Sequence, residues 1–444
     1  MTRIRPLRTK TLASARAAAG LLLAVIVAAC GTTTPTAAPS GSVAVTSVTS
    51  STAPAPASAP ATATASPSAA APLASIVPVP TSQLVAPVSP RAHLDEATAA
   101  ALQKALGGIR ATGGWPGVSA AVVFPDGSLW AGQSGSAVLS PQAPLTPDTL
   151  FSVGSISKTF VAALAGRLAA RGTISLDDPL AKYVPTFHDA ASITLRQLLN
   201  HTSGVQDIFE IKAFSDAILA NRTRAWTTEE VLAKVGSARY AFAPGKGYRY
   251  SNTDYVLLGA AIEQATGQPI AALIRSEFLE PLGLTHTFLQ TEEEAPGAKA
   301  HGYWTPASAP VDQSAGTMLP FTAEATAAGP AGAYVSTATD LARWGDALYN
   351  GNVLDQETLA AMADISQTQG FKAPYTPVHW LYGLGMEETS LAGQTAWGHR
   401  GHLDGFWSAM WYLPASHVTI VVIANAEWAD PVAACSTLAK VIMA

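Results

Sequence analysis

The sequence predicts an α/β (α+β) fold, in which an antiparallel sheet is flanked by helices and interrupted by an inserted, mainly helical domain. Segments rich in Val, Ile, Trp and Tyr occur near both ends of the globular part, while helical periodicity dominates roughly residues 160–330. The predicted strands cover residues 118–124, 128–133, 395–401, 406–413 and 418–423. Strands that enclose a helical stretch imply one shared sheet, with a functional site between sheet and insertion.

Each predicted element has a local signal. A helix is expected over 94–106, ended by Gly107-Gly108, and Pro125-Asp126-Gly127 marks the turn of the first hairpin. The Ala- and Leu-rich run that ends at Gly172 predicts a helix with Ser155 near its first turn. The remaining helices are expected at 193–199, 227–235, 252–266, 270–278, 340–349 and 431–443.

The first 90 residues differ from the rest. Basic residues followed by the apolar run 17–29 are typical of a secretory signal, which we assign to residues 1–29. The following Cys30, preceded by small residues, resembles the lipobox of bacterial lipoproteins and is the predicted lipidation site; an ordinary signal peptide is the alternative. Residues 30–90, with no charged side chain, predict a disordered Ala/Ser/Thr/Pro tether.

These segments predict where the protein resides. Residues 91–444 form the predicted globular domain, held by lipid at the extracytoplasmic face of a bacterial cell membrane, or secreted if Cys30 is not modified. The net charge is −5 and no basic run lies beyond the N-terminus, so nucleic acid is not an expected partner. Cys435 would then have no disulfide partner and is expected to be a buried small hydrophobe. The oligomeric state is left open.

Three motifs carry polar groups suited to acyl transfer. Ser155 and Lys158 form the only S-x-x-K, and residues three apart share a helix face, so the amine can lie beside the hydroxyl. Tyr250 and Asn252 form the only Y-x-N; a tyrosine beside an ammonium can act as a base, and the amide can orient a substrate carbonyl. Alone, either motif could be incidental.

The third motif is the segment 397–405, Trp-Gly-His-Arg-Gly-His-Leu-Asp-Gly, where Gly401 permits close approach of a ligand to the strand backbone. His399, His402 and Asp404 also suggest a metal site. However, residues of odd separation on a strand point to opposite faces, and no second histidine cluster completes such a site. We therefore expect neither a metal ion nor a cofactor.

In this order, the motifs resemble those of the serine β-lactamase and penicillin-binding protein-like family, closest to its class C β-lactamases, D,D-carboxypeptidases and related esterases. That pattern is S-x-x-K, then Y-x-N, then K-x-G or H-x-G on a strand, here His399 and Gly401. The stretches 172–179, 198–204 and 334–341 also look similar, so the resemblance covers roughly residues 95–443.

The resemblance implies roles for these residues. Ser155 attacks the acyl carbonyl, and Tyr250, supported by Lys158, takes its proton and later returns one to the leaving group. Which of the two is the primary base is left open. The backbone N–H groups of Ser155 and His402 form the oxyanion hole, and Asn252 holds the substrate amide.

His399, Arg400 and Gly401 are expected to line the substrate at the cleft edge. Arg400 departs from the family's usual small hydroxyl residue. It either points inward and binds a substrate carboxylate, or is solvated or paired with Asp404. The side chain of His402 could narrow the pocket.

The resulting hypothesis is a lipid-anchored serine hydrolase that forms an acyl-enzyme on Ser155 and acts on D-alanyl-D-alanine peptides of the cell wall. An esterase or a class C-type β-lactamase would use the same groups. A non-catalytic cell-surface binding protein that retains the fold is an alternative from another class, and a metallohydrolase is a third.

Overall fold

The computed structural model describes residues 94–236, 240–305, 309–371 and 381–443. The predicted signal peptide (1–29), Cys30 and the tether lie outside the described residues, so these assignments stay predictions. Among the residues described, no helix is both long enough and apolar enough to span a membrane.

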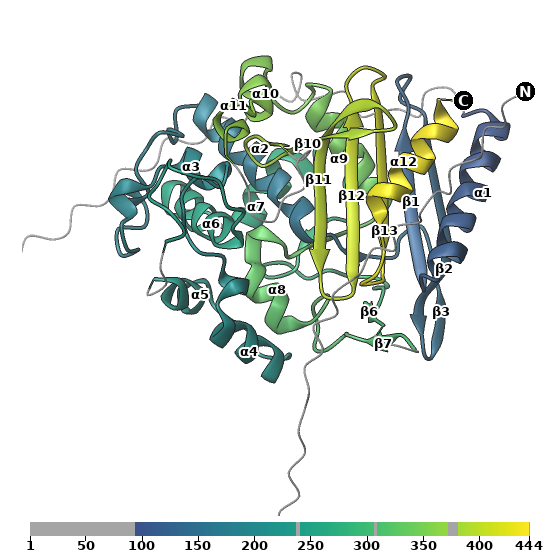
Figure 1. The fold of residues 1–444 in the computed structure, drawn as a ribbon, viewed down its shortest axis with the longest axis horizontal. Coiled ribbons are helices and arrows are strands. Elements are labelled where there is room, and N and C mark those ends of the chain that lie inside the picture. The colour runs from purple at the N-terminus through teal and green to yellow at the C-terminus, as the bar shows by residue number, and fades with distance from the viewer. Residues whose placement is uncertain (1–93, 237–239, 306–308, 372–380, 444) are drawn as a thin grey trace, which may run out of the picture. The chain divides into compact units, whose positions relative to one another are not determined.

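One eight-stranded antiparallel sheet joins the two ends of the domain (Figure 1), in the order β3-β2-β1-β13-β12-β11-β10-β9. The N-terminal and C-terminal strands meet where β1 pairs with β13, with Val118 opposite Ala424 and Val123 opposite Thr419. The predicted α/β (α+β) class is therefore confirmed. The strands are β1 Gly117–Val123, β2 Leu129–Leu139, β3 Gln142–Pro144, β9 Leu381–Tyr382, β10 Glu387–Leu391, β11 Gln394–Leu403, β12 Phe406–Leu413 and β13 Val418–Ala424.

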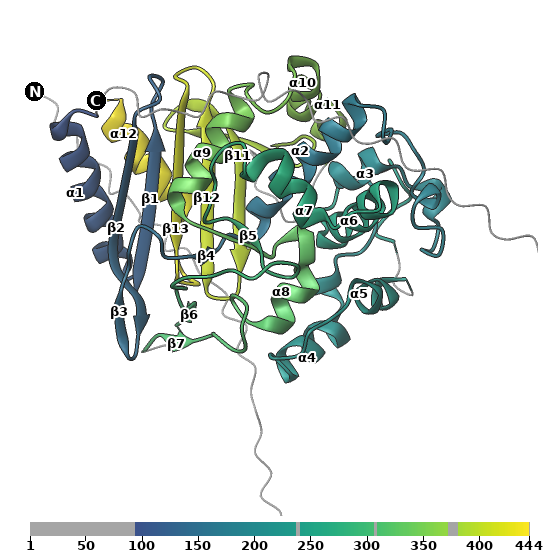
Figure 2. The same cartoon turned by 180° about the vertical axis from the view of Figure 1, so that it is seen from behind.

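The two faces of this sheet are covered by different helices. Helices α1 (Glu96–Gly113) and α12 (Pro431–Ile442) lie together on one face, and α9 (Ala338–Tyr349) lies on the other, as Figures 1 and 2 show from opposite sides. The α1/α12 face is packed with apolar side chains, including the free and buried Cys435. The face toward α9 continues into the larger core shared with the inserted helices.

The first helix corrects one prediction. It does not end at Gly107-Gly108 but continues to Gly113 and is capped by Gly114 at φ 63°. A left-handed C-cap is the position that favours glycine, whereas the earlier pair adopts ordinary helical backbone. A glycine pair alone was therefore a misleading stop signal.

The insertion is mainly helical. Its helices are α2 Ser157–Ala170, α3 Leu195–Leu199, α4 Lys212–Ala220, α5 Thr228–Val235, α6 Asn252–Thr266, α7 Ile270–Ile274 and α8 Thr322–Ala328, followed after α9 by α10 Gln356–Ala363 and α11 Ser366–Gln369. Small sheets pair β4 (Phe151–Ser152) and β5 (Phe288–Leu289) with β8 (Tyr334–Ser336), and β6 (Tyr303–Trp304) with β7 (Val311–Asp312). A capping box between Thr227 and Glu230 begins α5, within the helix expected over 227–235. Helix α2 enters the core directly after β4, which brings Ser155 between the sheet and the insertion.

Candidate active site

Ser155 lies in a tight 3₁₀ turn, Gly154–Ile156, that runs straight into α2. The Ser157 hydroxyl donates to the Gly154 carbonyl at 2.6 Å and fixes the turn. Gly154 has φ 50°, and a Cβ there would lie 2.5 Å from the backbone nitrogen of His402. The turn and strand β11 can therefore approach this closely only because residue 154 is glycine. Ser155 itself stays partly exposed.

Lys158 is fully buried in the first turn of α2, beside Ser155. Its Nζ lies 3.0 Å from Ser155 Oγ, 2.8 Å from Asn252 Oδ1 and 2.7 Å from the Ala331 carbonyl oxygen. Burial lowers the pKa of Lys158 to about 7, although the charges of Asp207, Glu387 and Asp254 oppose the shift. The amine is thus neutral in a large fraction of molecules near pH 7.

These three contacts fix where the lone pair of the neutral amine points. A neutral amine has two N–H donors and one lone pair. The Asn252 and Ala331 oxygens are carbonyl acceptors, so each takes one N–H. Only the Ser155 hydroxyl can donate, and it therefore faces the lone pair. This is the arrangement required for Lys158 to accept the serine proton.

Tyr250 precedes α6 and packs over Lys158, whose Nζ lies 4.8 Å from the centre of its ring. Burial raises the pKa of Tyr250 well above its usual value, and the neighbouring Ser155 hydroxyl opposes this shift. At standard geometry, however, the Tyr250 hydroxyl has no hydrogen-bond partner among the described residues. A phenolate is therefore disfavoured, and Tyr250 is better suited to donate a proton than to take the first one.

Behind Tyr250 lies a buried polar pair that the motif analysis missed. His201 Nδ1 lies 2.9 Å from Asp254 Oδ2, and Ser203 Oγ donates to the other carboxyl oxygen at 2.5 Å. The His201 ring lies 4.3 Å from the Tyr250 ring, centre to centre. Burial raises the pKa of Asp254 and lowers that of His201, so both groups tend to be neutral. The pair forms a rigid backing for the Tyr250 ring.

Strand β11 brings the third motif to the same place. The buried His399 imidazole shares a hydrogen bond of 3.0 Å with the Tyr382 hydroxyl, and burial lowers the pKa of His399 to about 4. It is therefore neutral at pH 7. A Cβ at Gly401 would overlap the Val153 carbonyl oxygen. The absence of a side chain at 401 therefore lets the segment just before Ser155 pack against strand β11. The predicted close approach to the strand is thus made by the protein itself.

The ion-pair partner of Arg400 is Glu387, and not Asp404 as one of the expectations had it. Its Nη2 lies 2.8 Å from Glu387 Oε1, and its Nε contacts both oxygens of that carboxylate. Pairing with Asp404 was wrong, because β10 places the buried Glu387 alongside β11. Burial opposes ionisation of both groups, but their mutual attraction prevails: it lowers the pKa of Glu387 and raises that of Arg400. A contact between Arg400 and substrate stays a prediction.

The backbone nitrogen of His402 lies beside the Gly154 turn, 2.5 Å from where a Cβ on Gly154 would be. Leu403 and Phe406 flank a two-residue turn, and residues in this position form a hydrogen-bonded pair. Every second residue of β11, counted from His402, therefore directs its backbone N–H away from β12. Arg400, two residues before His402, follows this rule, because its backbone N–H donates to Glu387 Oε2 at 3.0 Å and not to β12. The His402 N–H therefore faces the edge occupied by Gly154, where an oxyanion hole shared with the Ser155 N–H is expected.

The two histidines of the motif do not converge. The His402 ring lies 2.8 Å from Glu427 Oε1 and packs on Trp407, whereas His399 belongs to the Tyr382 side. Among the described residues, no group of three His, Cys, Asp or Glu side chains is arranged to bind a metal ion. The polar groups that do converge are those of the serine motifs.

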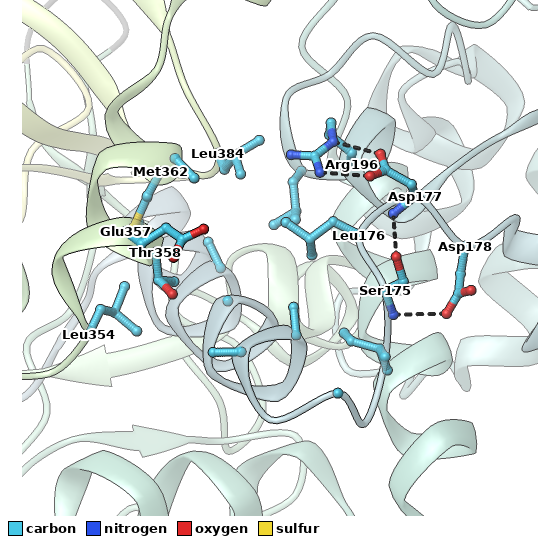
Figure 3. Close-up of a pocket in the computed structure, with 18 of the residues that line it drawn as sticks. Ser175, Leu176, Asp177, Asp178, Arg196, Leu354, Glu357, Thr358, Met362 and Leu384 are labelled. Carbon is cyan, nitrogen blue, oxygen red and sulfur yellow. Dashed lines mark hydrogen bonds and ion pairs between the residues drawn. The ribbon is translucent and has the colours of Figure 1, made fainter.

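A separate cavity of about 690 Å³ lies along the second half of α2 (Figure 3). Its walls include Leu354, Met362 and Leu384 on one side and the ion pair of Asp177 with Arg196 on the other. None of the predicted site residues lines it. This cavity is therefore distinct from the cluster around Ser155.

Sequence reasoning also missed two carboxylates at the site. Asp207 contacts Asn252, and Glu387 contacts Arg400. The only signal for the first was its place three residues after the family-like stretch 198–204. No signal marked Glu387, because β10 was not predicted as a strand.

The chain is similar to known proteins in sequence and in fold. The family described as Beta-lactamase matches residues 97–439. Esterase EstB of Burkholderia gladioli is 36% identical over 166 residues, which is 34% of this chain and 41% of that protein. The chain thus spans less than half of that relative.

Two solved structures are similar over most of the domain. A D-stereospecific amidohydrolase from Streptomyces sp. has a TM-score of 0.65 and 30% identity, covering 77% of this chain and 97% of that one. The D-amino acid amidase of Ochrobactrum anthropi SV3, in complex with L-phenylalanine amide, has a TM-score of 0.69 and 28% identity, covering 78% and 99%. Because the family match extends over most of the chain, the protein belongs to the β-lactamase family of serine hydrolases.

Proposed function

We propose that this protein hydrolyses amide bonds that follow a D-amino-acid residue, of the D-alanyl-D-alanine type, through an acyl-enzyme on Ser155. The observation that carries the proposal is the convergence of Ser155, Lys158 and Asn252 within hydrogen-bond distance. The similarity to a D-stereospecific amidohydrolase and a D-amino acid amidase supports the choice of a D-residue.

Acylation follows from the direction of the Lys158 lone pair. The neutral amine takes the proton of Ser155 Oγ as this oxygen bonds to the substrate carbonyl carbon. The N–H groups of Ser155 and His402 stabilise the resulting oxyanion; losing one such donor typically costs about 3–4 kcal/mol. Tyr250 passes a proton to the leaving nitrogen as its bond to carbon breaks, and Lys158 supplies the proton that Tyr250 gives up.

Deacylation uses the same proton path in reverse. Water loses a proton to the neutral Lys158 amine as it attacks the ester carbonyl, and Lys158 returns this proton to the Ser155 oxygen as that oxygen leaves. Asn252 orients the substrate amide with the N–H that its other contacts leave available. Arg400 and Glu387 border the strand along which the substrate would extend.

Intact-mass analysis tests the proposal. The protein is mixed in turn with a D-Ala-D-Ala peptide, D- and L-phenylalanine amides, a penicillin and a p-nitrophenyl ester. Turnover of the D-configured peptide or amide, without turnover of its L form and without any adduct in Ser155→Ala, is the expected result. Equal turnover of L and D forms would overturn the stereochemical part, and activity of Ser155→Ala would overturn the nucleophile.

An esterase is the second candidate, favoured by the similarity to Esterase EstB. Turnover of the ester alone would select it. Rapid penicillin turnover would instead indicate a β-lactamase. A failure of every substrate and of a fluorophosphonate probe to label Ser155 would indicate a binding protein that retains the fold.

We further propose that Cys30 anchors the protein to the membrane by lipid. The support is the small-residue stretch before this cysteine and the uncharged segment 31–90 after it. Expression in a bacterial host with an alkynyl fatty acid should label the wild type and leave Cys30→Ser unlabelled. Labelling of both proteins, or of neither, would contradict the anchor.

A further inference from the structure

Asp207 is a buried carboxylate that contacts the site through one residue, Asn252. Its Oδ2 accepts from the backbone N–H of Asn252 at 2.9 Å and from the side-chain Nδ2 at 2.8 Å. Its Oδ1 accepts from the Phe209 N–H at 2.8 Å. Both oxygens therefore act only as acceptors, as an ionised carboxylate does.

This contact decides which way the Asn252 amide faces. The side-chain oxygen accepts from Lys158 Nζ at 2.8 Å, and the nitrogen donates to Asp207. A half-turn of the amide would direct N–H groups at the amine's own N–H and an oxygen at a carboxylate. The charge-assisted hydrogen bond to Asp207 would become a repulsive contact between two oxygens, and the Lys158 N–H would lose its acceptor.

The orientation of Asn252 in turn decides where Lys158 directs its lone pair. While Asn252 presents an oxygen, Lys158 must donate to it, and the lone pair is left for Ser155. If Asn252 presented an N–H, this donor would compete with the Ser155 hydroxyl for the lone pair. The Asp207 carboxylate thus determines the donor and acceptor roles in the hydrogen bonds that run from Asn252 through Lys158 to Ser155.

We propose that Asp207 is a positioning residue that holds the Asn252 amide in the orientation that directs the Lys158 lone pair to Ser155. Asp207 touches neither the substrate nor the reacting atoms. The inference rests on the acyl-enzyme chemistry proposed above, but not on the identity of the substrate.

Asp207 has a second effect that a purely structural residue would lack. It is the largest of the influences that keep the pKa of Lys158 from falling further. Conversely, burial raises the pKa of Asp207, and its backbone N–H donors and Lys158 oppose the shift. Removing this charge therefore lowers the pKa of Lys158, and the rise of activity with pH moves to lower pH.

A double-mutant cycle on the full chain tests the proposal, with acylation by a p-nitrophenyl ester and a fluorophosphonate as readouts. We expect Asp207→Asn to slow acylation about 10–100-fold, less than the roughly 100–10,000-fold effect of losing a general base, because Lys158 itself is retained. Asn252→Ala should have a loss of similar size, and the double variant should lose at most about threefold more than Asn252→Ala alone, because the two residues act as a unit. Losses that multiply would overturn the proposal.

The pH profile and two controls complete the experiment. The rising limb should shift to lower pH in Asp207→Asn; a uniform loss with an unshifted limb would reduce Asp207 to a structural role. Asp216→Asn removes an exposed carboxylate that pairs with Lys212 on α4 and should leave rate and profile unchanged. If the wild type acylates with the probe but cleaves no D-residue amide, the proposed substrate fails while the cycle still decides the role of Asp207.

Discussion

The two halves of helix α2 each bury a cation, with opposite outcomes. Lys158, near its start, meets two carbonyl oxygens and a hydroxyl, and burial lowers its pKa to about 7. Arg167, near its end, donates to the Glu277 carboxylate at 2.8 Å and to backbone carbonyls, and a guanidinium keeps its charge. A buried cation becomes a usable base where its direct partners are neutral, and a structural anchor where a carboxylate compensates it.

The largest effect is expected when a guanidinium replaces the amine of residue 158. Lys158→Arg retains a cation but has no available lone pair, so acylation should fall about 1,000-fold, within the effect of a general base. The acylation rate of Lys158→Met, which removes the amine altogether, should fall by the same factor. Stopped-flow acylation measures both, and thermal unfolding confirms that each variant is folded. A Lys158→Arg enzyme with a tenth of the wild-type rate would contradict the role of the lone pair.

At the other end of the helix, stability rather than rate should respond. Glu277 also receives a bidentate contact from Arg171, at 2.7 and 2.9 Å. Glu277→Gln leaves two arginines without their carboxylate and should lower the free energy of unfolding by about 2–3 kcal/mol. This is less than the roughly 3–5 kcal/mol for a fully buried pair, because Glu277 is not fully buried. Urea denaturation measures the loss, and the rate per folded molecule should be unchanged.

The acid side of the stability curve provides a check on this prediction. Burial alone would raise the pKa of Glu277, but hydrogen bonds from Arg171 and Arg167 outweigh it and lower the pKa. The stabilisation is thus present above the unfolded pKa and lost as pH falls through the lower, folded value. Glu277→Gln should lose less stability on acidification than the wild type. Glu280→Gln, at an exposed neighbour, should match the wild type.

The third prediction concerns pH and activity. Because Lys158 must be neutral to accept a proton and its pKa is about 7, kcat/KM should fall about tenfold per pH unit well below 7 and level off above it. Tyr250→Phe should lower the plateau without moving this limb. A profile that is flat from pH 5 to 8 would show that Lys158 is not the titrating base.

The smallest effect is expected at Arg171, which is partly exposed. Arg171→Lys keeps the charge but not the bidentate geometry, and should cost about 0.5–1 kcal/mol of unfolding free energy. Denaturation of this variant beside Glu277→Gln separates geometry from charge. A loss as large as that of Glu277→Gln would mean that shape, not charge compensation, stabilises this end of α2.

The same contrast explains what could be predicted from the sequence. Ser155, Lys158, Tyr250 and Asn252 form local motifs, and helix geometry alone brings the first two together. Asp207 and Glu387 are single carboxylates whose importance arises from long-range packing, so no local pattern identified them. Arg400 illustrates the limit, since its partner lies on a strand whose short, polar sequence did not indicate β structure.

The strands with continuous apolar runs were predictable, and β12 has the predicted bounds. The sequence predicted helix ends less well where the end depends on the backbone conformation of a single residue. The left-handed cap at Gly114, and not the earlier Gly107-Gly108, ends α1. A glycine's role depends on the conformation and the neighbours it receives in the fold, which spacing does not reveal.

The outward-facing N–H of His402 has a consequence for how this family diversifies. The group expected to bind the oxyanion belongs to the backbone, and its direction is fixed by the two-residue turn between Leu403 and Phe406. Side chains at 400 and 402 can therefore change without removing that donor, so mutation can explore new substrates while the chemistry is inherited intact. A one-residue insertion in the turn would by contrast reverse the parity of β11 and remove the donor in a single evolutionary step.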